Sequence, residues 1–198
     1  MLVAIDGPAG AGKSPVARAV ADALGFTYLD TGAMYRCAAL AHPRPASELA
    51  ITFGPGGEVL LDGDDVSSQI RTAEVSAKAA EVAGDPEVRA ALVDRQRALI
   101  ARGDYVAEGR DIATVVAPDA EVKVFLTASP EERARRRAAE LGEDEATVLE
   151  ALLSRDATDV GFGRTPDAPA PGATPVDTTG LTIDEVVSKI VGLVNDVR

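Results

Sequence analysis

The sequence predicts an α/β fold built on a five-stranded parallel sheet flanked by helices. Short apolar runs alternate with segments of helical periodicity along most of the chain. A glycine-rich loop that ends in lysine and serine directly follows the first apolar run. The alternation is interrupted once, over about residues 37–100, by two β-like runs and two helical segments. We interpret this interruption as an insertion within a single domain of 198 residues.

The expected strands are five short apolar runs that end in turn residues, as buried parallel strands do. They cover residues 2–6, 26–32, 104–111, 121–128 and 176–180. The helices expected around them have apolar residues on one face and recognisable start or stop residues. They cover residues 15–25, 33–41, 129–142, 144–159 and 182–194. Ser129 with Glu132, and Thr182 with Glu185, each predict a capping box at a helix start.

The interrupting segment departs from the alternation of strands and helices seen in the rest of the chain. Residues 48–66 hold two β-like runs on either side of a Gly-Pro-Gly-Gly sequence, which predicts a hairpin. Residues 72–83 and 85–103 then predict two helices, the second with Asp85 as its N-cap. We therefore expect a core of about residues 1–36 and 101–198, with the insertion at 37–100. A helical lid is expected at about residues 129–165.

Charge and composition narrow the function classes. The formal net charge of −12 argues against binding a nucleic acid polymer, which relies on a basic surface. Cys37 is the only cysteine and His42 the only histidine, so neither an internal disulfide nor a Cys/His zinc site can form. No apolar run is long enough to span a membrane, and no basic segment precedes the first strand. We expect a cytoplasmic protein without a signal peptide.

Residues 7–14 read Gly-Pro-Ala-Gly-Ala-Gly-Lys-Ser and satisfy the pattern G-x-x-x-x-G-K-[ST]; we call them the phosphate loop. The pattern lies between a predicted strand and a predicted helix, so the helix N-terminus points at the bound anion. Its lysine is expected to reach the β- and γ-phosphates and its serine to hold Mg²⁺. The expected nucleotide-binding residues here are Gly7, Pro8, Ala9, Gly10, Ala11, Gly12, Lys13, Ser14 and Pro15.

Pro15 is unusual because proline has no backbone N–H to offer a nucleotide. One interpretation is that a proline in the first helical turn costs little, since first-turn N–H groups lack partners within the helix. The other is that nucleotide binding is weakened. On the second interpretation, replacing Pro15 with Thr lowers the Kd for ATP in titration calorimetry, and an unchanged Kd favours the first.

The rest of the chain indicates which kind of nucleotide protein this is. The only asparagine is Asn195, so the Asn-Lys-x-Asp guanine motif of GTPases is absent. The short chain, with its phosphate loop near the start and an arginine-rich helix late in the sequence, points to a small-molecule kinase.

Five collinear blocks make the sequence resemble the bacterial cytidylate kinases, a family of P-loop nucleoside monophosphate kinases. They are AIDGPAGAGKS, YLDTGAMYR, LLDGDDVSSQIRTAEVS, EGRDIATVV with the following PDAEVKVFLTAS, and PVDTTGLTIDEVV. The resemblance implies a P-loop kinase core with an inserted acceptor-binding subdomain and a helical lid. It implies transfer of a phosphoryl group from ATP, with Mg²⁺, to CMP or dCMP in pyrimidine nucleotide metabolism. A monomer is expected.

The resemblance also implies a set of site residues. Those expected on the acceptor nucleotide are Asp30, Thr31, Tyr35, Arg36, Arg110, Asp111, Arg155, Asp159 and Arg164. Those expected on ATP outside the phosphate loop are Arg133 and Arg137 in the lid. Lys13, Arg110, Arg133, Arg155 and Asp159 are expected to be catalytic. Ser14 is the expected metal ligand, with Glu108 and Asp111 as acidic candidates that act on Mg²⁺ indirectly. The alternative for the lid arginines is a solvated basic face paired with Glu140.

Some positions depart from the family pattern. Phe162 stands where the family has a second arginine after the aspartate, and Arg164 is the candidate replacement. Ala113 replaces a glycine, Ala117 replaces a phenylalanine, and the stretch after residue 36 is shorter than usual. These departures leave two alternatives open. One is another small-molecule kinase, of the UMP/CMP, shikimate or coenzyme-precursor type; the other is a nucleotide-binding regulator that has lost catalysis.

Overall fold

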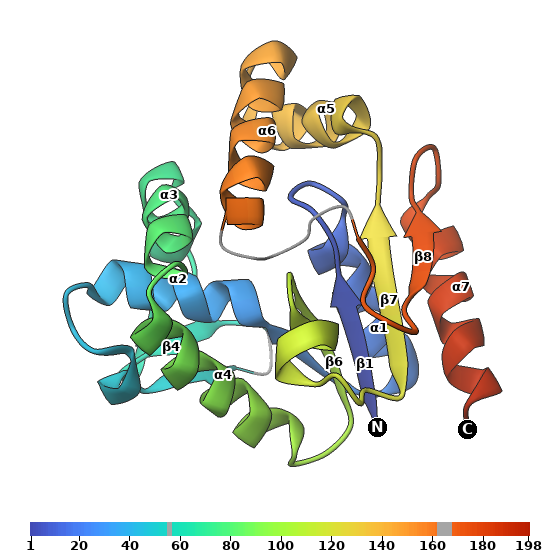
Figure 1. Cartoon of the computed structure of the whole chain (residues 1–198), viewed down its shortest axis with the longest axis horizontal. Coiled ribbons are helices and arrows are strands. Elements are labelled where there is room, and N and C mark those ends of the chain that lie inside the picture. The colour runs from blue at the N-terminus through green and yellow to red at the C-terminus, as the bar shows by residue number, and fades with distance from the viewer. Residues whose placement is uncertain (55–56, 162–167) are drawn as a thin grey trace. The chain divides into compact units, whose positions relative to one another are not determined.

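A computed structural model describes residues 1–54, 57–161 and 168–198 of the chain (Figure 1). The chain divides into two compact units. The first comprises Met1–Leu29 and Ile100–Arg198, and the second comprises Asp30–Leu99. The first unit holds the phosphate loop. The second holds most of the residues expected for the insertion, together with residues 30–36.

The first unit is built on the predicted five-stranded sheet, with strand order β2-β6-β1-β7-β8. Its strands are β1 (Leu2–Asp6), β2 (Thr27–Asp30), β6 (Tyr105–Gly109), β7 (Val122–Thr127) and β8 (Thr174–Asp177). Strand β1 pairs in parallel with β6 and with β7, and β7 pairs in parallel with β8. The carboxyl ends of these strands therefore meet at one edge, where open α/β sheets bind their ligands.

Helices of the first unit cover the sheet and extend beyond its carboxyl edge. They are α1 (Lys13–Leu24), α5 (Pro130–Leu141), α6 (Glu145–Gly161) and α7 (Ile183–Asp196). Buried valines and isoleucines of β1 and β7 form one apolar cluster with residues of α1 and α7, such as Val20 and Ile190. Helices α5 and α6 pack together beyond the carboxyl ends of β1 and β7 (Figure 1). A single π-helical turn, η3 (Ile112–Val116), follows β6.

The second unit contains the predicted hairpin and helices. Strands β3 (Ile51–Phe53), β4 (Val59–Leu61) and β5 (Asp64–Asp65) form a small antiparallel sheet, which confirms the hairpin around residues 54–57. Its helices are α2 (Thr31–Ala41), α3 (Ala73–Val82) and α4 (Pro86–Ile100), with short 3₁₀ turns at η1 (Ala46–Glu48) and η2 (Gln69–Arg71). Among the described residues, no helix is long and apolar enough to cross a membrane.

The last strand lies earlier than its predicted position at residues 176–180. Strand β8 begins at Thr174 and includes Pro175, both of which precede the predicted strand. A proline is tolerated there because β8 is an edge strand and one side of it needs no ladder hydrogen bonds. The chain turns after Asp177, and Gly180 in this turn has a φ of 72°.

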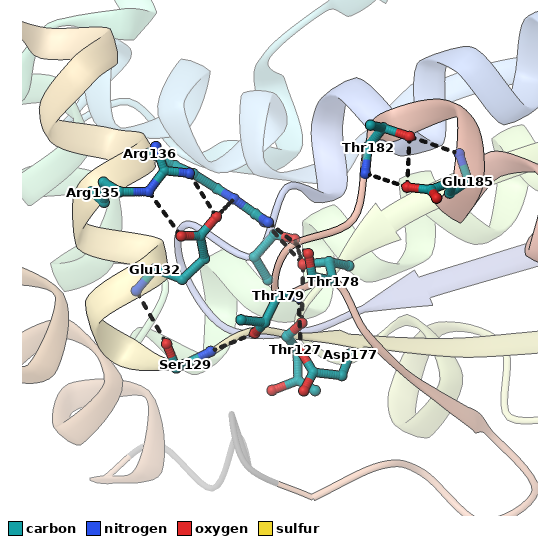
Figure 2. A network of polar contacts seen from close by, with 11 residues as sticks. Thr127, Ser129, Glu132, Arg135, Arg136, Asp177, Thr178, Thr179, Thr182 and Glu185 are labelled. Atoms are coloured by element: carbon teal, nitrogen blue, oxygen red, sulfur yellow. Dashed lines mark hydrogen bonds and ion pairs between the residues drawn. The ribbon is translucent and has the colours of Figure 1, made fainter.

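The two predicted capping boxes differ in outcome. At α7, the Thr182 hydroxyl accepts from Glu185 N–H and the Glu185 carboxylate accepts from Thr182 N–H, so the box is complete (Figure 2). At α5, Ser129 accepts from Glu132 N–H, but the Glu132 carboxylate binds Arg135 and Arg136 instead. The prediction for α5 was therefore half wrong, because charge-assisted bonds to guanidinium groups are stronger than a bond to a neutral amide.

Candidate active site

The phosphate loop joins the end of β1 to the start of α1. Gly7 has a φ of 152°, and a Cβ there would lie 2.1 Å from the Leu126 carbonyl oxygen of β7, so no other residue fits. Gly12 is the N-cap of α1 in the left-handed conformation, with a φ of 85°. One end of the loop is thus held against the sheet, and the other end leads directly into the N-terminus of α1. A helix N-terminus favours binding of an anion.

Three cations bind carbonyl oxygens of three consecutive residues in the phosphate loop. Arg110 Nη1 donates to Gly7 O at 2.6 Å, Lys13 Nζ to Pro8 O at 2.7 Å, and Arg133 Nη1 to Ala9 O at 2.9 Å. In a trans peptide the C=O of one residue and the N–H of the next point to opposite sides. The N–H groups of Ala9 and Gly10 therefore point away from these cations, where a phosphate oxygen can accept from them.

Positive charge is concentrated around Lys13. The pKa of Lys13 is lowered well below its usual value, first by loss of hydration and then by the positive charges of Arg110 and Arg155. Glu108 and Asp6 oppose this shift but do not cancel it. An anion bound among these cations would relieve their mutual repulsion, so the electrostatics favour a polyphosphate.

Two aspartates of helix α6 bind the two arginines that donate to the phosphate loop. Asp159 Oδ2 accepts from Arg110 Nε at 3.0 Å, and Asp156 Oδ2 accepts from Arg133 Nη1 at 2.7 Å. Asp159 was expected from the sequence, whereas Asp156 was not. A spacing of three places both side chains on one face of a helix, and that spacing could have drawn attention to Asp156.

Two buried acidic residues lie on β6 or shortly after it. Buried Glu108, on β6, accepts a hydrogen bond from the Tyr28 hydroxyl at 2.5 Å. Asp111 is also buried, and its carbonyl oxygen accepts from Val115 N–H at 2.8 Å in the η3 turn. Ala113, which replaces a family glycine, is buried and is not among the residues with positive φ, so its Cβ strains nothing in the backbone.

Asp6, at the end of β1, was missed by sequence analysis. Its carboxylate is 4% exposed and accepts from Ile112 N–H at 2.9 Å and from Ala113 N–H at 2.8 Å. These bonds fix the turn that follows Arg110 and Asp111. Burial raises the pKa of Asp6 to about 6, and the two backbone bonds only partly oppose this shift. An aspartate that ends an apolar strand was the available indication in the sequence.

We predict that Asp6 makes folding stability fall as pH rises. The unfolded chain loses this proton near pH 3.8 and the folded chain near pH 6, so ionisation costs the folded state. Between about pH 4 and pH 7, the unfolding free energy of wild type should fall relative to that of Asp6→Asn by roughly 2 kcal/mol. Urea titrations across this range measure the difference. A difference that rises with pH contradicts the prediction.

The acceptor residues at the start of α2 lie in the second unit. Asp30 is the N-cap of α2, where it accepts from Ala33 N–H at 2.8 Å, and it also binds Arg36 Nη2 at 2.9 Å. Thr31 is buried in the first turn of the helix. Tyr35 and Arg36 follow one turn later and are partly buried. The structure thus brings Asp30 and Arg36 together, and the helix places Thr31 and Tyr35 one turn apart.

The lid arginines have three different environments. Arg133 is 4% exposed and faces the phosphate loop, whereas Arg137 is exposed and pairs with Glu140 at 2.9 Å. Arg136 binds both Thr178 Oγ1 at 2.9 Å and Thr178 O at 2.7 Å, which ties α5 to the turn after β8 (Figure 2). The Thr178 hydroxyl is 3.4 Å from Ala11 O. Phe162 and Arg164 lie outside the described residues.

Pro15 occupies the third residue of α1, and its side chain is exposed. The N-cap Gly12 has no side chain that could accept from this position, so the missing N–H deprives the helix of nothing. The first helical hydrogen bond, from Val16 N–H to Gly12 O at 3.2 Å, is intact. Comparison of wild type with Pro15→Thr in ATP titration calorimetry decides whether the missing N–H weakens nucleotide binding.

The fold and the cation-lined phosphate loop define the class of a P-loop phosphotransferase. The sequence model of the cytidylate kinase family matches residues 3–196, so the chain belongs to that family. It is 48% identical to "Cytidylate kinase" of Carboxydothermus hydrogenoformans over the full length of both chains. It is 43% identical to "Cytidylate kinase" of Streptomyces griseus, covering 100% of this chain and 94% of that one.

Two solved structures share the fold. An uncharacterised protein from Eubacterium ventriosum superposes with a TM-score of 0.61 at 14% identity, covering 98% of each chain. A gluconokinase from Sinorhizobium meliloti superposes with a TM-score of 0.53 at 18% identity, covering 98% of this chain and 92% of that one. At these identities the likeness concerns the fold alone.

Proposed function

We propose that this protein transfers the γ-phosphoryl group of ATP to the phosphate of CMP or dCMP, giving ADP and CDP or dCDP. The observation that carries the proposal is membership of the cytidylate kinase family along nearly the whole chain. The cations that converge on the phosphate loop fit this reaction, because phosphoryl transfer depends on positioning and on neutralising charge.

At the donor end, the N–H groups of the phosphate loop hold the β- and γ-phosphates of ATP, and Lys13 moves from Pro8 O onto them. Arg155 adds positive charge near Lys13. Arg137, exposed on α5, closes over the phosphates when the lid moves. Water exclusion by this closure strengthens each of these electrostatic contacts.

Ser14 is the residue that would hold Mg²⁺. Its hydroxyl is exposed at the second residue of α1, beside Lys13, and oxygen ligands suit this ion. Mg²⁺ usually keeps several waters and binds through substrate phosphates and one or two side chains. It therefore needs no cage of carboxylates, and the described part of the chain shows no cluster of three His, Cys, Asp or Glu side chains suited to a metal. When bound, Mg²⁺ supplies charge neutralisation between the phosphates. Glu108 and Asp111 would act on it indirectly.

At the acceptor end, Arg36 binds the phosphate of the nucleotide, oriented by its ion pair with Asp30. Its Nε is buried and has no hydrogen-bond partner among the described residues, which leaves a donor for a phosphate oxygen. Thr31 and Tyr35 hold the nucleotide beside it. In the first unit, Arg110, Asp111, Arg155 and Asp159 are the residues proposed to bind the acceptor nucleotide. Because the attacking group is an anionic phosphate oxygen, the reaction requires no general base.

Arg164 takes the role of the family arginine whose position Phe162 occupies in this sequence. Arg164→Ala is therefore expected to lower kcat/KM for CMP by more than about tenfold, the loss of one charge-assisted contact in the transition state. Steady-state kinetics measure the effect, with Arg102→Ala as the control because Arg102 is exposed on a turn. A near-normal kcat/KM for Arg164→Ala would make Arg164 a surface residue without a role in the reaction.

A coupled assay of ADP release with CMP, dCMP, UMP and AMP as acceptors tests the proposed function. We expect turnover to be highest with CMP or dCMP. Preference for another acceptor would identify a different small-molecule kinase. ATP binding without ADP release would identify a regulator that has lost catalysis. We further propose that the enzyme works in the cytoplasm. We also propose that it is a monomer, and size-exclusion chromatography with light scattering measures its mass in solution.

A further inference from the structure

Two arginines each connect helix α6 to the phosphate loop. Arg110 joins Gly7 O to Asp159, and Arg133 joins Ala9 O to Asp156. We call these contacts the Arg110 bridge and the Arg133 bridge. Both aspartates lie on one face of α6, and both carbonyls lie in the phosphate loop. The bridges therefore hold the loop and the helix together at two points.

The two bridges differ in access. The Arg110 side chain is 17% exposed, and its partner Asp159 is also proposed to bind the acceptor. The Arg133 side chain is 4% exposed. Ala9, at the loop end of the Arg133 bridge, packs in an apolar cluster with Ala134 and Ala138 of α5 and Leu152 of α6. Solvent and ligands therefore have little access to the Arg133 guanidinium.

The Arg133 bridge is not arranged to maximise folding stability. Among the described residues, Arg133 Nε and Asp156 Oδ1 are buried without hydrogen-bond partners. A buried ion pair recovers its desolvation penalty only when its remaining polar atoms are also satisfied. The feature that distinguishes this pair is its contact with Ala9 O.

The Ala9 carbonyl belongs to the peptide whose Gly10 N–H can donate to a bound phosphate. Gly10 follows it with a φ of 76°, and a Cβ at Gly10 would lie 3.0 Å from Arg133 Cβ. Because glycine adopts either sign of φ readily, the Ala9–Gly10 peptide could flip if nothing held its carbonyl. A flip would turn the Gly10 N–H away from a bound phosphate and present a carbonyl oxygen in its place.

We propose that Arg133 and Asp156 are positioning residues for the donor nucleotide. Arg133, held by Asp156, fixes the Ala9–Gly10 peptide with its N–H toward the phosphate. This assigns Arg133 a role through Ala9 O in place of the direct phosphate contact expected from the sequence. The inference deepens the proposed function and rests on it only for the identity of the donor, ATP.

The test is the affinity for ATP in the absence of an acceptor, measured by titration calorimetry. Asp156→Asn, which leaves Arg133 in place, should raise the Kd for ATP by roughly ten- to a hundredfold. Arg133→Met should raise it similarly, and the double variant should bind no more weakly than Arg133→Met alone. Arg133→Lys keeps a charged donor and should fall between Arg133→Met and wild type. In steady-state assays KM for ATP should rise more than KM for CMP.

Glu150→Gln is the matched control, because Glu150 is exposed on the same helix. Each titration is run well below the melting temperature of the variant, so that all samples are folded. Wild-type ATP affinity in Asp156→Asn, together with weak binding in Arg133→Met, would overturn the proposal in favour of a direct phosphate contact. If neither variant folds at any temperature, the pair is required for folding and the proposal fails.

Failure of the proposed function is distinguishable from failure of this inference. If wild type binds ATP but phosphorylates no acceptor, the proposed function is wrong. The Kd values for ATP then still decide the role of Arg133 and Asp156.

Discussion

Replacement of Lys13 by Met is expected to lower kcat for phosphoryl transfer by on the order of a hundred- to a thousandfold while the protein stays folded. Lys13 is the cation of the phosphate loop and donates to Pro8 O within it. In the transition state negative charge spreads over the transferred phosphoryl oxygens. Methionine keeps most of the side-chain volume but neutralises none of this charge.

Folding stability should not fall in the same variant. The pKa of Lys13 is lowered by loss of hydration and by the charges of Arg110 and Arg155, so its positive charge is unfavourable in the empty site. Thermal unfolding followed by circular dichroism measures this. Lys189→Met, at an exposed position of α7, is the control. A Lys13→Met protein with near-normal kcat, or one that melts well below wild type, would contradict the role proposed for this residue.

Gly7→Ala is expected to destabilise the fold by about 3 kcal/mol or more. The added Cβ would lie 2.1 Å from Leu126 O, far inside contact distance. Leu126 cannot move away easily, because β7 is held in the sheet by β1 on one side and β8 on the other. Alanine is also strained at the Gly7 φ of 152°. A domain is stabilised by only about 5–15 kcal/mol in total. This one methyl group should therefore remove a large fraction of the free energy of unfolding.

Two other glycines provide matched controls for Gly7. A Cβ at Gly103 or Gly192 would have no atom within 4 Å, and neither residue has a positive φ. Gly192→Ala should stabilise α7 by up to about 1 kcal/mol through helix propensity. Urea unfolding of the three variants measures the differences. If Gly7→Ala unfolds at the same urea concentration as Gly103→Ala, the backbone contact with Leu126 does not constrain the loop.

The sequence predicted the elements that short-range chemistry determines. The strands β1, β6 and β7 follow from apolar runs, and the predicted cap residues Ser129 and Thr182 begin helices α5 and α7. The sequence prediction failed in two places. The Glu132 carboxylate binds Arg136 on the next turn of the same helix and does not close the capping box. Strand β8 begins earlier than predicted because it pairs with β7 despite Pro175.

The site was predictable only in part. The phosphate loop could be recognised because its chemistry is contained in eight consecutive residues. The neighbours of this loop could not be derived in the same way. Arg110, Arg133 and Asp156 come from separate elements, and their contacts depend on how the first unit packs.

The sequence by itself determined that this protein has an α/β core and a phosphate-binding loop, and it indicated the cytidylate kinase family. These conclusions need only periodicity, turn chemistry and collinear motifs, all of which are local or linear along the chain. Only the tertiary structure decided which side of the phosphate loop each charge faces. It turned Arg133 inward to Ala9 O, left Arg137 at the surface and made Asp6 a buried anchor for the η3 turn. Burial and hydrogen bonding between distant segments fix these orientations, and residue type alone does not reveal them.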